Sequence, residues 1–398
     1  MHLKYLQLTI SAASEKRFII ALTLLWLALH VALYFIHGVR TTGDTKQYLN
    51  YAAHILENGE LANNYYLKYA GYPIFLSILF KLGFSLKGVI ICQTLLSGVA
   101  TVYFYKATRK LAGNPIAPIL ATFILIAWYD LQLLHAFIMT ESLYISLLMM
   151  GFYLLVRAKN VSQSGWALLA LIGVALVRPN GFIAVVAYLG YLIVLAYQKA
   201  TTKKAKATLL ALVVIVPLAA VLVVDQYLLT GFLIVETYEK GELIYMYRDW
   251  LVHPDKPIVM PPVDASPLTK MYLFVRDNTS YFVRMSAWRF LLFWGNFKPF
   301  FSTAHNLGIA VVLYPMYVFT AIVMLRNRIP ASVRVFVALV LLQQAFITTV
   351  TSEDWMGRFL MSVVAFVFMF GSIGLSWQLE KWQEKYKPAP KAAVPAAP

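Results

Sequence analysis

Four charged residues stand beside long apolar segments, where a charged side chain is costly and usually has a function. In chain order they are Asp44, Glu141, Arg178 and Arg358. A carboxylate in such a place can act as a general base, and a guanidinium can hold a phosphate or pair with a carboxylate. Each residue also has a structural interpretation. The two acids can cap or begin a helix, and the two arginines can reach the interface or pair with local acids.

The composition places these residues in a membrane protein. Hydrophobic residues make up 60% of the 398 residues and charged residues only 13%, which excludes a water-soluble globule. Apolar runs of about 20 residues, the length of a span, recur along the chain, and no small-residue cleavage site suggests a removed signal. The single cysteine, Cys92, lies in an apolar run, so neither a disulfide nor a thiolate metal site is available.

The apolar pattern predicts an all-α, polytopic transmembrane protein with about ten spans. Two short interfacial helices are expected in the first outer loop, from an amphipathic stretch around Tyr48 and from the apolar run after Pro73. The expected spans cover residues 18–37, 86–107, 115–133, 138–157, 164–180, 181–198, 207–228, 306–325, 332–351 and 359–378.

Lysine and arginine collect in alternate loops, which sets the expected orientation. The positive-inside rule places both termini in the cytoplasm and assigns the net charge of +16 to that side. The charge then reflects topology and attraction to anionic membrane lipids, and nucleic acid is not needed as a partner to explain it. We expect a multi-pass protein of a bacterial inner membrane, with residues 38–85 and 229–305 facing the periplasm or exterior.

Four regions are predicted along the chain. They are a membrane module with the first seven spans and a catalytic outer loop (1–228), an interfacial outer region (229–305), the C-terminal spans (306–380) and a disordered cytoplasmic tail (381–398).

The order of several short motifs resembles the GT-C glycosyltransferases, polytopic enzymes that move a sugar from a polyprenyl phosphate to an acceptor. The motifs are Asp44, Ala70-Gly71-Tyr72-Pro73, Gln93-Thr94-Leu95-Leu96-Ser97, Arg109-Lys110-Leu111-Ala112-Gly113, Thr140-Glu141-Ser142, Arg178-Pro179-Asn180-Gly181 and Gly357-Arg358-Phe359. The chain is similar to the group of protein mannosyltransferases and aminoarabinose transferases, closely over residues 40–182. Protein O-mannosyltransferases typically carry an Asp-Glu pair where Asp44 stands alone, which disfavours that subfamily. The lack of a large soluble C-terminal domain disfavours oligosaccharyltransferases.

The resemblance implies an inverting hexosyl- or pentosyltransferase that moves a monosaccharide from a polyprenyl-phosphate donor to an envelope glycan, lipid or protein outside the cytoplasm. Displacing phosphate from the anomeric carbon requires a base for the hydroxyl and positive charge for the departing phosphate. Neither a P-loop nor a G-x-G-x-x-G motif is present, and an activated lipid donor needs neither. A lipid-linked sugar flippase or transporter is the alternative, and a binding or assembly scaffold is a third possibility.

This chemistry selects the candidate site residues. Asp44 is the predicted general base, and Glu141 would orient a basic partner, hold the acceptor or ligate a cation. Tyr48 and Tyr72 are candidates for binding the sugar. The candidates for binding the donor phosphate are Arg178, Arg358, Lys68 and Arg289. A divalent cation, if one is used, would be held by Asp44, Glu141 and His135, although no ligand spacing requires it.

Overall fold

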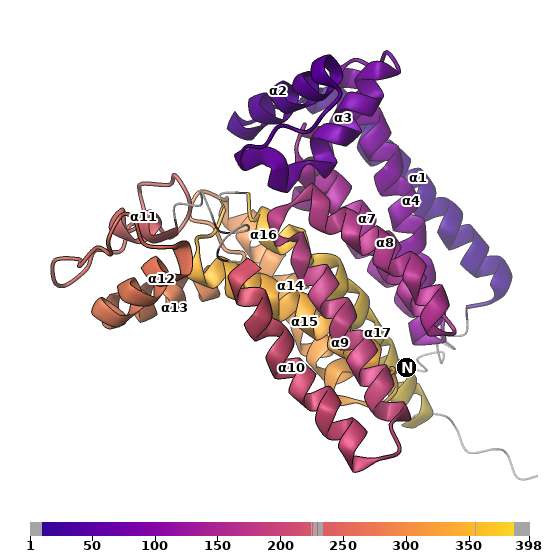
Figure 1. The fold of residues 1–398 in the computed structure, drawn as a ribbon. Coiled ribbons are helices and arrows are strands. Elements are labelled where there is room, and N and C mark those ends of the chain that lie inside the picture. The colour runs from indigo at the N-terminus through magenta and orange to yellow at the C-terminus, as the bar shows by residue number, and fades with distance from the viewer. Residues whose placement is uncertain (1–9, 224, 226–228, 230–233, 355, 386–398) are drawn as a thin grey trace, which may run out of the picture.

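The chain folds into helices around one main core (Figure 1). The structure is a computed structural model that describes residues 10–223, 225, 229, 234–354 and 356–385, and these contain no β-strand. The helices are α1 (Ala12–His37), α2 (Gly43–Asn58), η1 (Tyr65–Tyr69), α3 (Gly71–Lys81), α4 (Leu86–Ala112), α5 (Ile116–Ala127), α6 (Tyr129–Leu133), η2 (Leu134–Ala136), α7 (Thr140–Arg157), α8 (Val161–Val177), η3 (Pro179–Gly181), α9 (Phe182–Lys199), α10 (Lys203–Val223), α11 (Ile234–Glu239), α12 (Pro267–Asp277), α13 (Thr279–Gly295), α14 (Thr303–Leu325), α15 (Ala331–Val350), α16 (Arg358–Met361) and α17 (Val364–Lys385). The predicted all-helical class is confirmed.

Each of the ten expected spans contains a helix, but fewer helices have the length and composition to cross a bilayer alone. Five qualify among the described residues: α1, α4, α14, α15 and the continuous segment Pro179–Lys199. A sixth candidate joins α5 to α6 and η2, with a 61° bend at the extended residue Trp128. Helix α8 is shorter because Pro179 follows its last turn. The helices therefore indicate a polytopic membrane protein, without establishing the count of ten.

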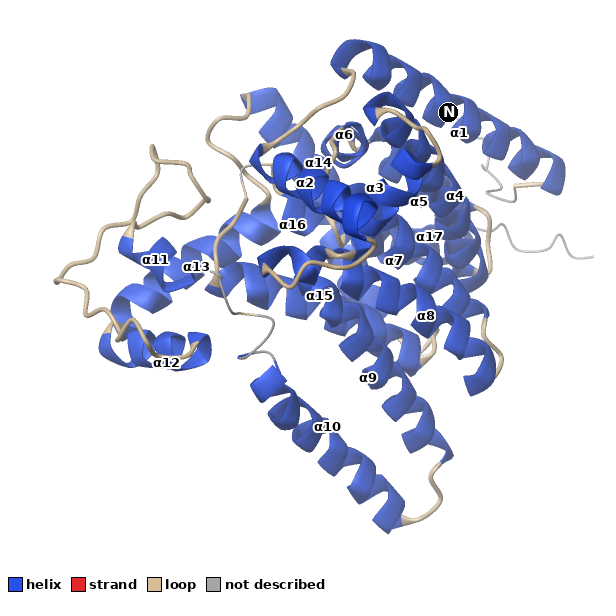
Figure 2. Cartoon of the chain, turned by 45° about the horizontal axis from the view of Figure 1, so that its top comes forward, coloured by secondary structure: helices blue, strands red, loops and turns tan. Residues whose placement is uncertain are grey.

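The segment between α1 and α4 forms two α-helices and a 3-10 helix that lie over the upper end of the bundle in Figure 1. Figure 2, which brings that end forward, places α2 and α3 across the ends of other helices. Helix α3 packs against α8 and α4. A Cβ atom at Gly71 would lie 2.9 Å from the backbone of Leu176 and Val177, so only glycine allows this close approach.

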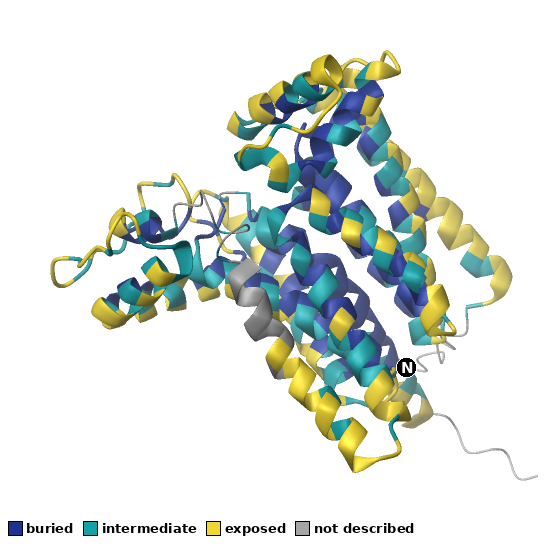
Figure 3. Ribbon diagram, in the orientation of Figure 1, coloured by how far each residue is buried: buried dark blue, intermediate teal, exposed yellow. Residues whose placement is uncertain are grey.

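Burial is concentrated in α17 and the helices around it (Figure 3). Every residue from Val364 to Gly374 is buried, and α17 packs against α14, α5 and α4. By contrast, α1 exposes apolar side chains such as Phe35 and Ile36. Exposed apolar helix faces around a buried centre are the pattern expected of a bundle surrounded by lipid.

Helices α11, α12 and α13 form a smaller second core beside the bundle. Its centre contains Tyr238, Phe274 and Met285, all fully buried. The bridge between Ile244 and Glu353 links this unit to the loop before α16, because Tyr245 N–H donates to the Glu353 carbonyl at 2.8 Å.

Candidate active site

Asp44 lies in the first turn of α2, and the backbone around it is fixed from two directions. Thr42 is the N-cap residue of this helix, so Asp44 does not cap it. The Thr45 hydroxyl accepts a hydrogen bond from Thr42 N–H at 2.9 Å and donates to the Ile138 carbonyl at 3.0 Å. These bonds attach the start of α2 to the segment before α7. The Asp44 side chain remains 47% exposed, and its carboxylate faces Arg358.

Glu141 and Arg178 form a buried ion pair between neighbouring helices. Glu141 is the second residue of α7, where the helix dipole favours a carboxylate. Arg178 is the C-cap residue of α8, and Pro179 stops the helix there. Nη1 of Arg178 donates to Oε1 of Glu141 at 2.8 Å, with the two side chains 7% and 1% exposed. The positive charge of Arg178 is therefore paired with a carboxylate of the protein itself, Glu141.

Arg358 joins this pair to Asp44. Its Nη1 lies 3.3 Å from Oδ2 of Asp44 and 3.4 Å from Oε1 of Glu141, and its Nε lies 3.0 Å from Oδ2 of Asp354. Burial lowers the pKa of Arg358, but Asp354, Glu141 and Asp44 raise it by more, so the net shift is upward. The guanidinium is therefore a permanent cation held by three carboxylates.

We call Asp44, Glu141, Arg178, Asp354 and Arg358 the charged cluster. It contains three carboxylates and two guanidiniums, contributed by α2, α7, the end of α8 and the turn leading into α16. The four residues singled out in the sequence are thus brought together, although they are far apart in the chain. The three acids of the cluster differ in exposure, because Glu141 and Asp354 are buried while Asp44 meets solvent.

The turn before α16 aims Arg358 into the cluster. Gly357 has a φ of +64°, and a Cβ atom there would lie 2.5 Å from Oδ1 of Asn296. Asp354 Oδ1 accepts from Met356 N–H at 2.9 Å, and the Asp354 carbonyl accepts from Gly357 N–H at 3.0 Å. Glycine at position 357 therefore satisfies both a conformational and a steric requirement.

A second buried ion pair supports this turn. Nζ of Lys298 lies 3.7 Å from Oε1 of Glu353, and both side chains are buried. Burial raises the pKa of Glu353, against the opposing effect of Lys298. Burial also lowers the pKa of Lys298, against the opposing effects of Glu353 and Asp354. Glu353 in turn accepts from Asp354 N–H at 2.8 Å, which connects the pair to the charged cluster.

Tyr48 and Tyr72, the tyrosines expected to bind sugar, are buried rather than presented to solvent. Tyr72 is fully buried and donates to Oε1 of Gln93 at 3.3 Å. The amide nitrogen of Gln93 donates to the carbonyls of His135 and Phe137 at 2.8 and 2.7 Å, so these residues brace the segment before Glu141. Burial, together with Tyr69 and Asp44, raises the pKa of Tyr48 well above its usual value.

Two half-buried tyrosines of η1 lie closer to solvent than these. Tyr66 and Tyr69 pack against Tyr48 with ring centres 6.2 and 5.7 Å apart. Burial raises the pKa of Tyr66, and Asp44 raises it further. Burial and Asp44 raise the pKa of Tyr69, while Arg178 and Arg358 lower it. Both phenols therefore lie within electrostatic reach of the charged cluster.

Arg289 and Lys68, two other phosphate candidates, have different surroundings. Arg289 is fully buried in the second core, where it donates to the Glu242 carbonyl at 2.7 Å and lies 4.1 Å from the Tyr238 ring centre. The packing of α13 onto α11 and α15 therefore keeps Arg289 out of the charged cluster. Lys68 lies on η1, with its Nζ 5.1 Å from the centre of the Tyr65 ring.

The proposed metal ligands Asp44, Glu141 and His135 are not assembled into one site. Across the described part of the chain, no three His, Cys, Asp or Glu side chains are grouped to hold a metal ion. Nδ1 of His135 lies 2.7 Å from the Ser142 hydroxyl, and its ring packs against His30 at 5.6 Å. Glu141 instead pairs with the two arginines. The prediction of one metal site is therefore corrected: Asp44 and Glu141 contact arginine in the charged cluster, and His135 pairs with His30 elsewhere.

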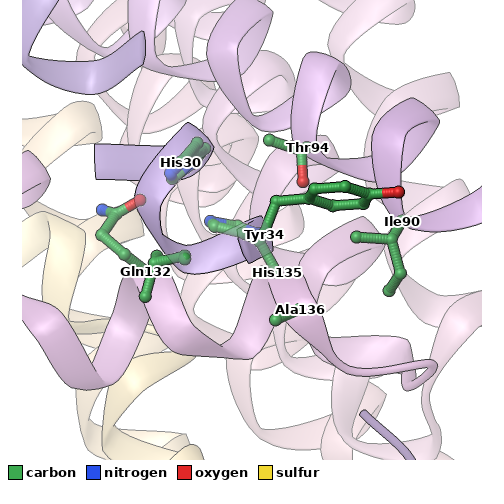
Figure 4. A pocket seen from close by; sticks show the side chains of 8 residues that line it. His30, Tyr34, Ile90, Thr94, Gln132, His135 and Ala136 are labelled. Atoms are coloured by element: carbon green, nitrogen blue, oxygen red, sulfur yellow. The ribbon is translucent and has the colours of Figure 1, made fainter. Parts of the chain in front are cut away.

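The two histidines line a small pocket between α1, α4 and η2 (Figure 4). Tyr34, Thr94 and Gln132 complete its polar lining. None of the residues lining this pocket belongs to the charged cluster, so we distinguish the two sites.

Comparison with known proteins bears on the central part of the chain. Residues 71–224 match the family model described as dolichyl-phosphate-mannose-protein mannosyltransferase, a domain of the GT-C superfamily. The resemblance to the GT-C superfamily is therefore shown for residues 71–224. No curated protein matches the chain. The match indicates glycosyltransferase activity of the mannosyltransferase type, and together with the apolar helices it indicates an integral membrane protein.

The matched segment includes only part of the charged cluster. Glu141 and Arg178 lie inside the matched range, whereas Asp44, Asp354 and Arg358 lie outside it. The expectation that the single acid Asp44 disfavours the protein O-mannosyltransferase subfamily stays a prediction. The match begins after Asp44, so it does not bear on that position itself.

Sequence reasoning did not name all the residues that complete the site around the matched segment. Asp354 was considered only as a neighbouring acid with which Arg358 could pair, and not as a site residue. The run Tyr65-Tyr66-Leu67-Lys68-Tyr69 was a stronger signal, because three tyrosines in five residues are unusual in a short loop.

Proposed function

We propose that this protein is an inverting glycosyltransferase that moves a monosaccharide from a polyprenyl-phosphate donor to an envelope glycan, lipid or protein. The observation that carries the proposal is the charged cluster, in which the exposed acid Asp44 lies 3.3 Å from Arg358, and Arg358 in turn lies 3.4 Å from Glu141 of the Glu141–Arg178 pair. One solvent-accessible carboxylate and two guanidiniums in the same ionic network provide a base and a phosphate site.

Asp44 is the proposed base because it is the most exposed carboxylate of the cluster. The acceptor oxygen attacks the anomeric carbon from the face opposite the phosphate, and its proton passes to the Asp44 carboxylate. The bond from the anomeric carbon to the phosphate oxygen breaks, and its electron pair leaves with the lipid phosphate. Inversion follows from this single displacement. Glu141, buried between Arg178 and Arg358, is assigned to orienting these cations.

Arg358 and Arg178 are the proposed partners of the donor phosphate. Fixed positive groups near a departing phosphate stabilise the charge that grows as the bond breaks. Arg358 contacts three carboxylates, and Asp44 is the most accessible of them. A phosphate that approaches from solvent would replace the Asp44 contact first. Donor binding would then release Asp44 from its ion pair and leave it able to accept a proton.

Tyr66 and Tyr69 are the proposed contacts for the sugar, in place of the buried Tyr48 and Tyr72. Both side chains are half-buried and pack against Tyr48, and burial and the charge of Asp44 raise the pKa of each. A tyrosine offers an apolar face to a sugar ring and a hydroxyl that can hydrogen-bond to sugar oxygens.

The membrane arrangement that fits this chemistry has the cluster on the non-cytoplasmic side of a bacterial inner membrane. Helices α2, α3 and α16 lie at one end of the bundle. The N-terminal end of α1 and the C-terminal end of α17 lie at the opposite end (Figure 1). The positive-inside rule assigns those opposite ends to the cytoplasm. The lipid tail of the donor would then enter from the bilayer while the acceptor approaches from water.

The proposal is tested by incubating the purified full-length protein with radiolabelled polyprenyl-phosphate sugars, hexoses and pentoses separately, and with extracted envelope acceptors. Transfer of label to an acceptor, with the anomeric configuration inverted in the product, supports it. Transport of the labelled donor across proteoliposomes without any transfer would contradict it and favour a flippase. A product with retained configuration would contradict the single displacement.

A further inference from the structure

Helix α13 buries an arginine and exposes several large apolar side chains. Arg289 is fully buried, whereas Leu291, its second neighbour, is 58% exposed. Val283, Phe290 and Leu291 are all exposed at the spacing of one helix face, and Trp288 lies beside them. We call these four residues the α13 stripe. A helix of a water-soluble unit would place the arginine outside and the phenylalanine inside.

Helix α12 provides the contrast within the same unit. Phe274 is fully buried, while Thr269 and Arg276 lie on the exposed face, together with one exposed tyrosine, Tyr272. Both helices pack around the same second core, with Tyr238 between them. The two neighbouring helices therefore indicate different surroundings, water for the polar face of α12 and an apolar medium for the α13 stripe.

The position of α13 in the bundle agrees with an apolar medium. The Tyr317 hydroxyl donates to the Trp294 carbonyl at 2.9 Å, and the Tyr314 hydroxyl donates to the Gly295 carbonyl at 3.2 Å. Tyr314 is the midpoint of α14, a helix with the length and composition of a span. At 1.5 Å per residue, this point lies roughly 16 Å along α14 from its start. The C-terminal end of α13 is thus attached to the middle of a candidate span.

We infer that the α13 stripe lies in the hydrocarbon of the bilayer, in the half nearest the charged cluster. Leu307, Val311 and Val318 of α14 are exposed at the spacing of the helix face that holds Tyr314, the residue bonded to the end of α13. An arginine on the protein side of a membrane-embedded helix, bonded to a carbonyl and a hydroxyl and over an aromatic ring, is an arrangement that lipid surroundings favour. The inference depends on membrane insertion and not on the proposed reaction.

One consequence concerns the charged cluster. Asn296 follows α13 directly and contacts Gly357, the residue before Arg358. A lipid chain along the α13 stripe would therefore lie next to the turn that presents Arg358. This gives the lipid-linked donor a route from the bilayer to the cluster.

The test measures what surrounds the stripe in the full-length protein, reconstituted in nanodiscs of phosphatidylethanolamine and phosphatidylglycerol. In a Cys92→Ser background, nitroxide labels are attached at Val283→Cys and Phe290→Cys, with Thr269→Cys and Arg276→Cys on α12 as matched controls. Leu291→Cys replaces Phe290→Cys if that variant fails to fold. Power saturation then compares access of oxygen, which concentrates in hydrocarbon, with access of a water-soluble nickel chelate.

We expect oxygen access to exceed nickel access several-fold at the α13 positions and the reverse at the α12 positions. Equal nickel access at Phe290 and Thr269 would place the stripe in water and overturn the inference. Low access of both reagents at Phe290 would also overturn it, because another protein surface would then cover the stripe. Neither reading depends on enzymatic activity, so the inference and the proposed function can fail separately.

Discussion

The guanidinium of Arg358 lies 3.3 Å from the carboxylate of Asp44, although 314 residues separate them in the chain. The contact joins the start of α2 to the turn before the last helix. Arg358 also contacts Glu141 of the buried Glu141–Arg178 pair, so one ionic network connects the matched segment with two regions outside it. Substitutions in this network and in the turn beside it lead to separate predictions about stability, donor binding and pH dependence.

Replacing Glu141 with glutamine should destabilise the protein strongly. Arg178 would lose its 2.8 Å carboxylate partner while remaining 7% exposed, and breaking a buried pair in this way costs about 3–5 kcal/mol. Thermal unfolding in detergent measures the effect. Glu15→Gln is the matched control, because its pair with Arg109 is more exposed and should contribute about 1 kcal/mol or less. Equal shifts in the two variants would contradict the account. Adding Arg178→Leu to Glu141→Gln should recover part of the loss.

Replacing Arg358 with glutamine should weaken donor binding. Losing one partner of a largely buried charge pair costs about 2–5 kcal/mol, or roughly 30-fold or more in affinity. Titration of a polyprenyl-phosphate sugar into the full-length protein measures the dissociation constant. Arg284→Gln, which removes an arginine paired with the exposed Asp255, serves as the control and should bind as the wild type does. Unchanged affinity in a folded Arg358→Gln variant would remove this arginine from the phosphate site.

Gly357→Ala should be more damaging than an alanine at another left-handed glycine. Gly59 has a φ of +73° and no atom within 4 Å of an added Cβ, so Gly59→Ala measures the conformational cost alone, about 1–2 kcal/mol. Gly357→Ala adds the contact with Asn296 and should lower the melting temperature further, with weaker donor binding. If the two variants melt together, Asn296 does not restrict the turn.

Glu353 should make stability fall as the pH rises. Burial raises its pKa above the ordinary value of 4.5, despite Lys298, so the folded state holds the proton more tightly than the unfolded state. Protonation of Glu353 therefore contributes stability at low pH, and this contribution is lost as the pH rises from about 4.5 through the raised value. Melting temperatures of the wild type and Glu353→Gln are measured from pH 4 to 8. The melting temperature of the wild type should fall relative to that of the variant as the pH rises. A difference that stays constant, or that moves the other way, would show that the pKa is not raised.

The apolar pattern of the sequence allowed the all-helical class to be predicted. It also singled out Asp44, Glu141, Arg178 and Arg358, because a charged side chain beside an apolar segment is costly wherever the chain folds. It did not separate these from Arg289, which has the same residue type near an apolar helix but is buried in another core. Only packing decides which arginine meets which acid. For the same reason, Tyr72 and Tyr48 could not be distinguished from Tyr66 and Tyr69, since the four differ in burial and not in chemistry.

The span count shows a second limit. Hydropathy identified a helix in every expected segment, yet the bend at Trp128 and the end of α8 at Arg178 depend on local backbone conformation.

The pair of His30 and His135 shows a third limit of prediction from the sequence. His135 was grouped with Asp44 and Glu141 because all three can bind metal, whereas in the fold His135 packs against His30 and lies 2.7 Å from the Ser142 hydroxyl.

The central claim, that Asp44 is the base, is tested most directly by comparing Asp44→Asn with the wild type in donor binding and in sugar transfer, using an acceptor established for the wild type. Asp255→Asn, an exposed aspartate paired with Arg284, is the matched control. The account predicts that Asp44→Asn binds the donor at least as well as the wild type and transfers roughly 10²–10⁴-fold more slowly, while Asp255→Asn keeps both properties. Transfer by a folded Asp44→Asn variant at the wild-type rate would contradict the assignment of Asp44 as the base.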